Sequence, residues 1–343
     1  MATSGTTSQL SFPKRWIAHT RESLRVSARS VCEWLDVSPQ DRWARILPRT
    51  HMGGLSLDVR SEVSGCTIID GPPGQNLRWN PKEIADWLEK ERATLVSAVP
   101  AQIWDWVQAK IPAPSPLRGV IVGGDRLDLN LADQAVALGW PLLKSYGMTE
   151  TASMIACDRE AANRSEWIPL LPHVQAERSS DGCLTLTSQA LFTAELVWNK
   201  SINQYKLFNI NNSQSSWTAS DQVEIRGRSL RVVGRSDEQI KINGQAIDLG
   251  TLDLKLAEIL RANHLQFSAV FFDIPDPRSG CRIAIVVDGE SGKSAGEMLL
   301  KLWNTSCSSL EKASQVYWLP KLPRTDLGKL KRAQIRSLIP SLV

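Results

Sequence analysis

The chain has 343 residues, of which 42% are hydrophobic and 22% are charged, a composition that excludes intrinsic disorder and collagen-like repeats. The net charge of +4 is too weak to predict a nucleic-acid partner. The length is sufficient for two domains, and no apolar run approaches the ~18–20 residues of a membrane-spanning helix.

The cysteines and the amino terminus favour a cytoplasmic location. The six cysteines lie far apart and form no C-x-x-C pair: Cys32, Cys66, Cys157, Cys183, Cys281 and Cys307. This spacing does not support a zinc ribbon or a thioredoxin-like site and is typical of a reducing compartment. The first eight residues have neither the basic nor the apolar segment of an export signal.

Residues 23–140 alternate between helical and strand-like patterns. Asn80 and Pro81 predict an N-cap and a first helical position, opening an amphipathic helix that runs to about Arg92. The next predicted elements are a strand over 95–99, a helix over 101–110, a strand over 117–122 that ends in Gly123 and Gly124, and a helix over 130–138 closed by Gly139. This alternation predicts α/β layers around a mainly parallel sheet.

The rest of the chain has a different texture. Residues 166–217 are rich in Ser, Thr and Asn, with strand patterns over 182–187 and 194–198, and predict a smaller, mostly β region. The predicted elements after Arg235 are a helix over 249–261, strands over 269–274 and 282–287, a helix over 295–303, a strand over 315–319 and a basic helix from about 328. We therefore expect two domains, residues 1–235 and residues 236–343, the second a compact α+β unit.

Residues 145–151 form the most specific motif, Ser-Tyr-Gly-Met-Thr-Glu-Thr. They follow a predicted strand, and ligands of open α/β sheets bind at the carboxyl ends of the strands. A carboxylate beside phosphates usually holds Mg²⁺, which makes Glu150 a candidate metal ligand. Local chemistry alone favours the alternative of a glycine turn and a polar helix start capped by Thr149.

Residues 3–7 read Thr-Ser-Gly-Thr-Thr and are followed by Pro13 and Lys14. These residue types offer backbone N–H groups, hydroxyls and positive charge to phosphate oxygens. The spacing is not that of a Walker A motif, and a segment of this kind is more often a disordered amino terminus.

Two further motifs lie toward the carboxyl end. Arg235 opens residues 234–244, and Asp221 precedes them; a carboxylate and a guanidinium can together hold a ribose diol. The alternative is a hairpin with a surface ion pair, which contributes little. Residues 322–329 form a turn that presents Lys329, although most such lysines are solvated and inert.

The order and spacing of the four motifs resemble the acyl-adenylate-forming (AMP-binding) superfamily of acyl-CoA synthetases, peptide-synthetase adenylation domains and luciferases. The resemblance extends from residue 3 to about residue 336 and is strongest over 146–151, 234–247 and 322–332. Within the superfamily, the chain is most similar to the o-succinylbenzoate–CoA ligases of menaquinone or phylloquinone synthesis. This narrower similarity is carried by residues 47–56, 97–102 and 117–125 and by Arg60.

The resemblance implies a two-step reaction with ATP, Mg²⁺, coenzyme A and a small acid. The carboxylate of the acid attacks the α-phosphate of MgATP to give acyl-AMP and pyrophosphate, and the thiol of coenzyme A then attacks acyl-AMP and releases AMP. Thr149 would contact the α-phosphate and Glu150 would bind Mg²⁺. The other implied nucleotide-binding residues are Ser4, Gly5, Thr6, Thr7 and Lys14 for the β- and γ-phosphates, Gly123, Gly124 and Tyr146 beside the adenine with Gly147 next to them, and Asp221 and Arg235 for the ribose hydroxyls.

Four more residues receive roles by the same resemblance. Lys329 would bridge the carboxylate and the α-phosphate, where a preorganised cation lowers the barrier. Asp237 would be the hinge about which residues 236–343 rotate between the half-reactions, as a small mobile α+β domain beside a large α/β domain with a β-rich subregion. His51 would act in catalysis and at the acyl pocket, the alternative being an ordinary partly buried histidine. Arg60 would pair with the second carboxylate of o-succinylbenzoate, with a structural ion pair as the alternative.

The sequence departs from the family pattern mainly at its start. The phosphate loop usually follows a substantial α/β segment but here begins at residue 3, so we expect either a misplaced start codon or a truncated chain. Ser8 replaces a loop glycine, and Pro13 and Lys14 come three residues late. Ser220 stands where the family usually has the glycine of Thr-Gly-Asp.

Three hypotheses follow from the sequence. The first is an o-succinylbenzoate–CoA ligase, the second is a ligase of the same mechanism for another aryl or fatty acid, and the third is a non-catalytic remnant or binding module. The basic stretch over 329–336 more often forms a solvated helix face than a nucleic-acid site. The oligomeric state is left open, with a homo-oligomer among the alternatives.

Overall fold

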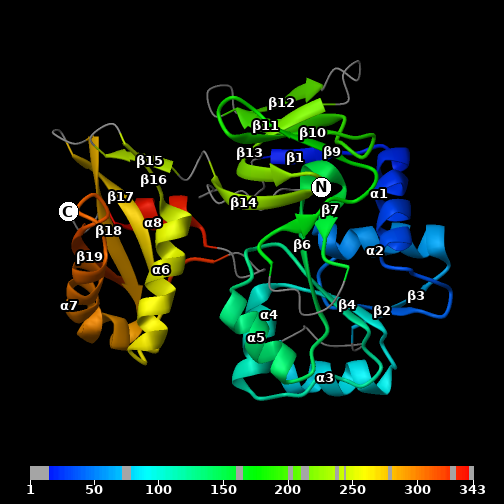
Figure 1. Cartoon of the computed structure of the whole chain (residues 1–343), viewed down its shortest axis with the longest axis horizontal. Coiled ribbons are helices and arrows are strands. Elements are labelled where there is room, and N and C mark those ends of the chain that lie inside the picture. The colour runs from blue at the N-terminus through cyan, green and yellow to red at the C-terminus, as the bar shows by residue number, and fades with distance from the viewer. Residues whose placement is uncertain are drawn as a thin grey trace.

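The computed structural model describes residues 15–71, 79–159, 165–199, 204–209, 216–235, 239–242, 245–276, 280–324 and 330–339. These residues form a mixed α/β structure with several sheets (Figure 1). The expected α/β class with a β-rich subregion is confirmed. No helix in the described part of the chain combines the length and the apolar character that a membrane crossing requires.

A six-stranded sheet organises the first part of the chain. Its strand order is β3-β2-β4-β5-β6-β7, and all neighbouring strands are parallel except β6 and β7. The strands are β2 (Arg42–Arg45), β3 (Thr67–Asp70), β4 (Leu95–Ala98), β5 (Gly119–Val122), β6 (Leu142–Met148) and β7 (Ser153–Cys157). Every residue of β4 and β5 is buried, as expected for parallel strands covered on both faces.

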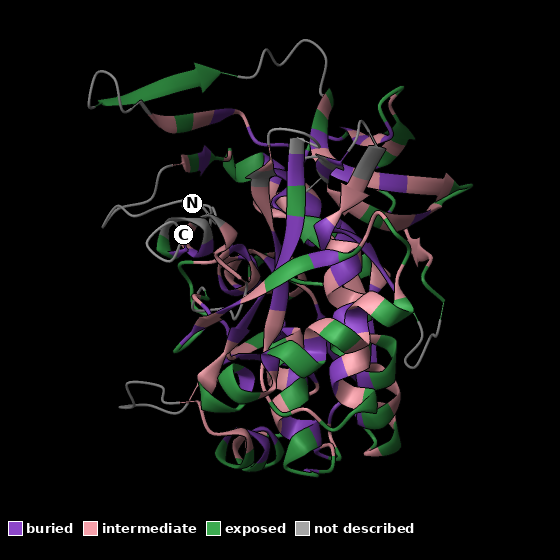
Figure 2. Ribbon diagram, turned by 90° about the vertical axis from the view of Figure 1, so that its left-hand side faces the viewer, coloured by how far each residue is buried: buried purple, intermediate pink, exposed green. Residues whose placement is uncertain are grey.

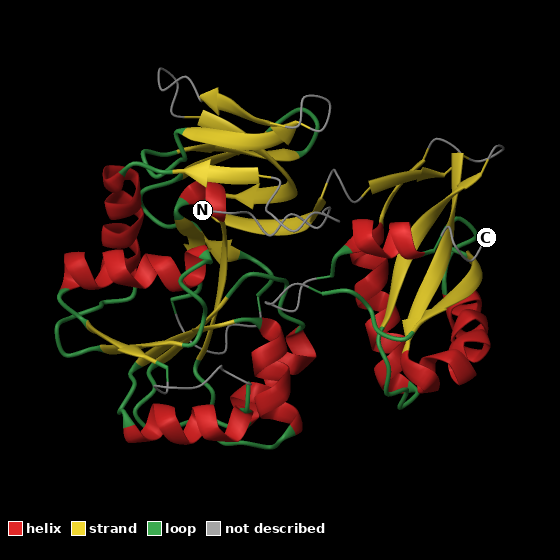
Figure 3. Cartoon of the chain, turned by 180° about the vertical axis from the view of Figure 1, so that it is seen from behind, coloured by secondary structure: helices red, strands yellow, loops and turns green. Residues whose placement is uncertain are grey.

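Helices cover both faces of this sheet (Figure 3). One face packs against α1 (Arg21–Trp34) and α2 (Met52–Ser64), and the other against α3 (Pro81–Lys90), α4 (Pro100–Gln108) and α5 (Leu129–Ala137). The predicted signals at two helix ends are confirmed. The Asn80 side chain accepts from the backbone N–H groups of Lys82 and Glu83, and Gly139 follows α5 with φ of +87°.

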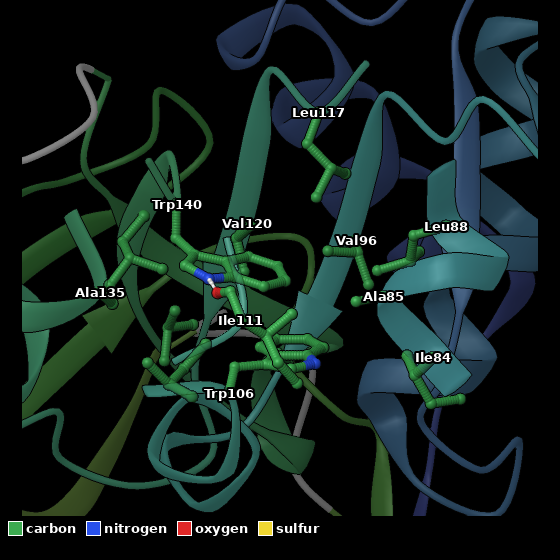
Figure 4. Packing of buried hydrophobic residues seen from close by; sticks show 14 of the residues in the cluster. Ile84, Ala85, Leu88, Val96, Trp106, Ile111, Leu117, Val120, Ala135 and Trp140 are labelled. Carbon is green, nitrogen blue, oxygen red and sulfur yellow. Dashed lines mark hydrogen bonds between the residues drawn. The ribbon is translucent and has the colours of Figure 1, made fainter. Parts of the chain in front are cut away.

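Two tryptophans lie in the core on this face of the sheet, Trp106 on α4 and Trp140 just after α5 (Figure 4). The rings of Trp106 and Trp140 stack with centroids 4.2 Å apart and an interplanar angle of 15°. Their indole N–H groups donate to the carbonyl oxygens of Pro81 at 3.0 Å and Ile111 at 2.9 Å. These two large side chains are therefore buried without an unsatisfied donor.

The β-rich part contains two antiparallel sheets. A five-stranded sheet has the order β8-β14-β13-β10-β9, and a three-stranded sheet has the order β1-β11-β12. The strands are β1 (Arg15–Ala18), β8 (Ile168–Pro169), β9 (Gln175–Arg178), β10 (Cys183–Thr187), β11 (Ala194–Asn199), β12 (Gln204–Asn209), β13 (Ser216–Arg226) and β14 (Ser229–Arg235). Figure 2 shows the contrast between the buried interior and β12, which is exposed along its whole length.

The elements from residue 239 onward have their own hydrophobic clusters. They are β15 (Gln239–Ile242), β16 (Gln245–Asp248), α6 (Leu249–Ala262), β17 (Ala269–Asp276), β18 (Gly280–Asp288), α7 (Gly289–Ser306), β19 (Ala313–Leu319) and α8 (Arg332–Leu338). We call this part the carboxyl-terminal lobe and residues 15–235 the amino-terminal lobe. The predicted strands over 269–274 and 282–287 are both present and pair antiparallel.

An ion pair crosses between the two lobes, which lie side by side in Figures 1 and 3. Arg261 on α6 contacts Asp128 with both of its terminal nitrogens, at 2.5 Å and 3.1 Å. Asp128 is also the N-cap of α5, accepting from the backbone N–H of Leu131 at 3.0 Å. One carboxylate therefore starts a helix of the amino-terminal lobe and holds the carboxyl-terminal lobe.

Candidate active site

The candidate site lies at the carboxyl ends of β5 and β6. Ser145 donates a hydrogen bond from Oγ to the carbonyl oxygen of Val122 at 3.0 Å, which draws the end of β5 against β6. A Cβ on Gly123 would lie 2.7 Å from that Ser145 Oγ, and Gly124 has φ of +84°, so both positions favour glycine. The structure therefore brings Gly123 and Gly124 beside the residue that precedes Tyr146.

A tight hairpin joins β6 to β7 and presents the short 3₁₀ helix η1 (Thr149–Thr151). A Cβ on Gly147 would lie 2.2 Å from the carbonyl oxygen of Ser153, so only glycine permits this approach of the two strands. Ala152 and Ser153 have φ of +57° and +132°, which is strained backbone for residues with a side chain. Strain of this kind persists where the surroundings fix the conformation, and it occurs often at functional sites.

The hydroxyl of Thr151 holds the hairpin from inside. It accepts from the backbone N–H of Met148 at 3.2 Å and lies 2.7 Å from the carbonyl oxygen of Ser153. The residue before the helix is Met148, so the alternative in which Thr149 caps this helix is wrong. The side chain of Thr149 is half-buried.

His19 fixes the backbone of Thr149. Its Nε2 lies 2.7 Å from the carbonyl oxygen of Thr149 and donates to it, while Nδ1 lies 3.3 Å from Ser23 Oγ. Burial lowers the pKa of His19 below its usual value, which favours the neutral imidazole. This contact could not be predicted from the sequence, because it joins residues 130 positions apart.

Glu150 lies in a partly buried cluster of charges. It is 8% exposed, and its carboxylate forms an ion pair with Arg15. The same guanidinium donates from Nε to Glu195 Oε2 at 2.6 Å. Burial acts to lower the pKa of Arg15, but the two carboxylates outweigh it and the pKa is raised.

The donor set of this cluster fits Mg²⁺, which proteins commonly hold through one or two carboxylates together with substrate phosphates. Glu150 supplies the hard oxygen ligands that this cation prefers, and Glu195 shares its guanidinium partner. Within the described ranges, they do not belong to a group of three or more His, Cys, Asp or Glu residues suited to a metal. A metal here would therefore depend on oxygens of the nucleotide.

Tyr146, Asp221 and Arg235 form one hydrogen-bonded chain. Tyr146 Oη donates to Asp221 Oδ2 at 2.6 Å, and Arg235 Nη1 donates to Asp221 Oδ1 at 2.9 Å. Asp221 and Arg235 lie opposite each other in the pairing of β13 with β14. Burial, with the charge of Asp221, raises the pKa of Tyr146 well above its usual value, so the phenol stays protonated and donates. Ser220, the departure from the family pattern, accepts from Arg235 Nη2 at 2.7 Å and thereby orients the guanidinium.

The end of β14 also contacts the first helix of the carboxyl-terminal lobe. Asp248, the N-cap of α6, accepts from the backbone N–H of Arg235 at 3.2 Å and from that of Thr251 at 2.6 Å. A Cβ on Gly234 would lie 2.2 Å from the Asp248 carboxylate. Gly234 therefore allows β14 to approach the start of α6.

His51 lies at the carboxyl edge of the parallel sheet, whereas Arg60 is buried inside the amino-terminal lobe. His51 is the N-cap of α2 in the loop after β2, at the same edge of the parallel sheet as Gly123 and Gly124. Arg60 is 2% exposed; its guanidinium lies 4.8 Å from the ring centroid of Trp43 and donates to Ser153 Oγ at 2.6 Å. Burial lowers the pKa of Arg60 to about 10. These contacts join α2 to the start of β7 and, among the described residues, include no ion pair.

Seven of the predicted site residues lie outside the described residues. They are Ser4, Gly5, Thr6, Thr7 and Lys14 of the expected phosphate loop, the hinge candidate Asp237 and the lysine Lys329. Their roles remain predictions from the sequence.

A comparison with protein families decides the wider assignment. Residues 1–177, just over half of the chain, match the family model described as AMP-binding enzyme. The chain belongs to this family. The four motifs and the hairpin at Tyr146–Glu150 thus lie in a protein of the expected superfamily.

Individual relatives are more distant. The 2-succinylbenzoate–CoA ligase of Bacillus subtilis is 31% identical over 155 residues, which are 45% of this chain and 30% of that ligase. The Staphylococcus aureus enzyme of the same name is 31% identical over 156 residues, 45% of this chain and 29% of that enzyme. The aligned part thus covers less than a third of each relative.

Solved structures show the same fold. The B. subtilis o-succinylbenzoate coenzyme A synthetase in complex with ATP and magnesium superposes with a TM-score of 0.79 at 22% identity, covering 98% of this chain and 69% of that one. ATP-bound MatB from Rhodopseudomonas palustris gives 0.78 at 18% identity, covering 99% and 67%. At these identities the likeness establishes the fold alone.

Proposed function

We propose that this protein activates a carboxylic acid with ATP to form an acyl adenylate and then transfers the acyl group to coenzyme A. The observation that carries the proposal is the arrangement of Tyr146–Glu150. One end of this segment joins the Asp221–Arg235 network and follows Ser145 at the strand end of Gly123 and Gly124, and the other presents Thr149 and Glu150. A nucleotide needs such a combination: a ribose clamp, a site for its base, and a hydroxyl and a carboxylate for its phosphates.

The carboxylate of Asp221 and its two donors support the proposed ribose site. Asp221 is 7% exposed, and both of its oxygens are occupied by donors, Tyr146 on one and Arg235 on the other. The carboxylate is thereby fixed in one orientation and keeps its remaining lone pairs for the two hydroxyls of a ribose. The residue before Tyr146, Ser145, bonds the end of β5 just before the expected adenine site at Gly123 and Gly124.

The residues that the β6–β7 hairpin presents support the proposed phosphate site. Thr149, with its carbonyl held by His19, would offer its hydroxyl to the α-phosphate, and Glu150 would hold Mg²⁺ with the nucleotide. When bound, the metal would neutralise charge on the phosphates. Lys329 would supply a cation at the reacting carboxylate, and rotation about Asp237 would exchange it for coenzyme A.

We propose o-succinylbenzoate as the acid. Two named relatives with this substrate in their names support it, at 31% identity over less than half of the chain. His51 lies at the edge of the sheet that carries the nucleotide residues and would line the acyl pocket. Arg60 would pair with the second carboxylate of the acid, and its burial against Trp43 and Ser153 means that this carboxylate would have to reach a covered site.

The test is acid-dependent exchange of labelled pyrophosphate into ATP by the full chain. Exchange with o-succinylbenzoate supports adenylation and the acid together, and exchange only with another aryl or fatty acid replaces the acid but keeps the mechanism. Thermal stabilisation by ATP without exchange for any acid of the panel would favour the non-catalytic binding module. E150Q is the matched control, because it should suppress exchange while it preserves the shape of the side chain.

A further inference from the structure

Arg15 joins two carboxylates that come from distant segments. In the antiparallel pairing of β1 with β11, Arg15 lies opposite Val197, and Ile17 lies opposite Glu195. Arg15 and Glu195 are therefore diagonal neighbours on one face of the sheet, within reach of long side chains. The Nη2 nitrogen of Arg15 contacts Glu195, and its Nη1 nitrogen contacts Glu150 on η1.

The backbone holds Glu150 against the same sheet. The N–H of Phe192 donates to the carbonyl oxygen of Glu150 at 2.9 Å, and the N–H of Thr193 donates to Ala18 at the end of β1 at 2.9 Å. The segment that leads into β11 is thus bonded to both η1 and β1. These backbone hydrogen bonds fix the relative backbone positions of Arg15, Glu150 and Glu195.

The cluster is only partly open to solvent. The side chains of Glu150, Glu195 and Arg15 are 11%, 24% and 32% exposed. Water therefore screens their interaction less than it would on an open surface. Two carboxylates and one guanidinium leave a formal charge of −1 in this space.

A guanidinium and a divalent cation compete for these oxygens. Arginine is always charged and has donors only, so it cannot become a metal ligand and repels a metal that approaches its partner. It also keeps the carboxylate of Glu150 oriented and neutralised while no metal is bound. If Glu150 turns to a metal, Glu195 remains as a partner for Arg15, so the guanidinium is not left without a counter-ion.

We propose that Arg15 is a positioning residue for Glu150. It is a resident counter-ion that holds the carboxylate in place and sets the divalent-cation concentration at which ATP binds, with Glu195 as its alternative partner. The inference rests on the proposed function, because it takes Glu150 as the metal ligand.

The test measures ATP binding to the full chain by calorimetry over a range of Mg²⁺ concentrations, with Mn²⁺ binding by electron paramagnetic resonance as a second readout. R15Q should reach half-saturation at about fivefold lower cation concentration, the scale of one partly exposed ion pair. E195Q should need a higher concentration, because Arg15 then has Glu150 as its remaining partner in the cluster. R15K keeps the charge and should stay close to wild type.

The control is R25Q, which removes a guanidinium on α1 from an exposed pair with Glu62 on α2 and should leave the titration unchanged. If R15Q and E195Q both titrate like wild type while E150Q needs more cation, the role of Arg15 is overturned and the proposed function stands. If wild type shows no cation-dependent ATP binding, both the role of Arg15 and the proposed function are overturned. The opposite shifts in E195Q and R15Q cannot arise from a general loss of folding. R15Q also tests the inference alone, because a loss of folding would weaken ATP binding whereas R15Q should lower the cation concentration that binding needs.

Discussion

Asp221 joins two side chains of the candidate ribose site, since Tyr146 and Arg235 both donate to it. In D221N an NH2 group replaces one carboxylate oxygen and cannot accept a hydrogen bond, and the charge that orients Arg235 is lost. Hydrogen bonds to charged groups contribute about 1.5–3 kcal/mol each, so ATP should bind at least about tenfold more weakly. Calorimetric titration of the purified chain with MgATP measures this change.

S220A is the matched control for that change. It removes one hydrogen bond to Arg235 but keeps the contact of Arg235 with Asp221, so ATP affinity should fall by about threefold or less. Equal affinities for D221N and wild type would place the ribose elsewhere in the molecule.

His173 gives a prediction about stability and pH. Both ring nitrogens are buried and, among the described residues, have no hydrogen-bond partner. Burial lowers the pKa of His173 to about 4, against 6.5 in an unfolded chain. Because the unfolded state then binds a proton that the folded state does not, stability falls as the pH drops below 6.5.

The size of this effect follows from the two pKa values. Between pH 7.5 and pH 5, the free energy of unfolding should fall by about 2 kcal/mol through His173 alone. H173F, which fills the site without a titrating group, should lose that part of the pH dependence in urea unfolding curves. H264F, at a histidine with left-handed backbone just after α6, should keep it. An unchanged slope in H173F would contradict the assignment.

Among the elements, the β6–β7 hairpin concentrates strain and predicted function in the same few residues. A Cβ on Gly147 would meet the backbone of β7 at 2.2 Å, and backbone cannot move aside as a flexible side chain can. G147A should therefore destabilise the protein by about 2–4 kcal/mol and abolish ATP binding. Thermal unfolding with and without MgATP separates the two effects.

G227A is the control for the hairpin. Gly227 lies in the turn between β13 and β14 with φ of +56°, and a Cβ there would meet nothing within 4 Å. It should lose about 1 kcal/mol from the left-handed backbone and retain ATP binding. If G147A bound ATP like G227A, the close approach of β6 and β7 would not be required for the site.

Local signals predicted elements well where the cause was local. The cap at Asn80 and the glycine at Gly139 involve neighbours a few residues away, and both were confirmed. The helix predicted over 295–303 is instead α7 (Gly289–Ser306), because the glycines and serines at its start are poor helix formers by themselves. Gly292 and Gly296 lie against Val287 and Val316, so tertiary packing stabilises this helix where its propensity does not.

In the candidate site too, the residues of local motifs could be predicted, whereas those joined by distant contacts could not. Tyr146, Thr149, Glu150, Asp221 and Arg235 belong to motifs that the family resemblance identifies, and the structure links several of them through hydrogen bonds. His19 and Glu195 escaped prediction because their contacts to Thr149 and Arg15 span 130 and 180 positions. The Arg15–Glu195 contact comes from the pairing of β1 with β11, and the His19–Thr149 contact joins the residue after β1 to η1. Neither contact leaves a pattern in one segment alone.

For the whole molecule, the ion pair between Arg261 and Asp128 bears on the proposed rotation of the carboxyl-terminal lobe. The two side chains are 29% and 28% exposed and bonded through two pairs of atoms, so the pair is stronger than an open surface contact. Any rotation of residues 236–343 that carries α6 away from α5 must break it. The pair should therefore favour the arrangement of the lobes described here over any other.

R261Q removes this preference but leaves Asp128 as the cap of α5. A partly buried pair contributes about 1 kcal/mol, so the population of other arrangements should rise about fivefold. Small-angle scattering should show a broader distribution of dimensions for R261Q than for wild type at low salt. At about 0.5 M salt, where the pair is screened, the difference should shrink. K255Q, which removes a pair with Glu311 inside the carboxyl-terminal lobe, should scatter like wild type at both salt concentrations. Identical scattering of R261Q and wild type at low salt would mean that the other contacts between the lobes, such as Asp248 with Arg235, set their arrangement alone.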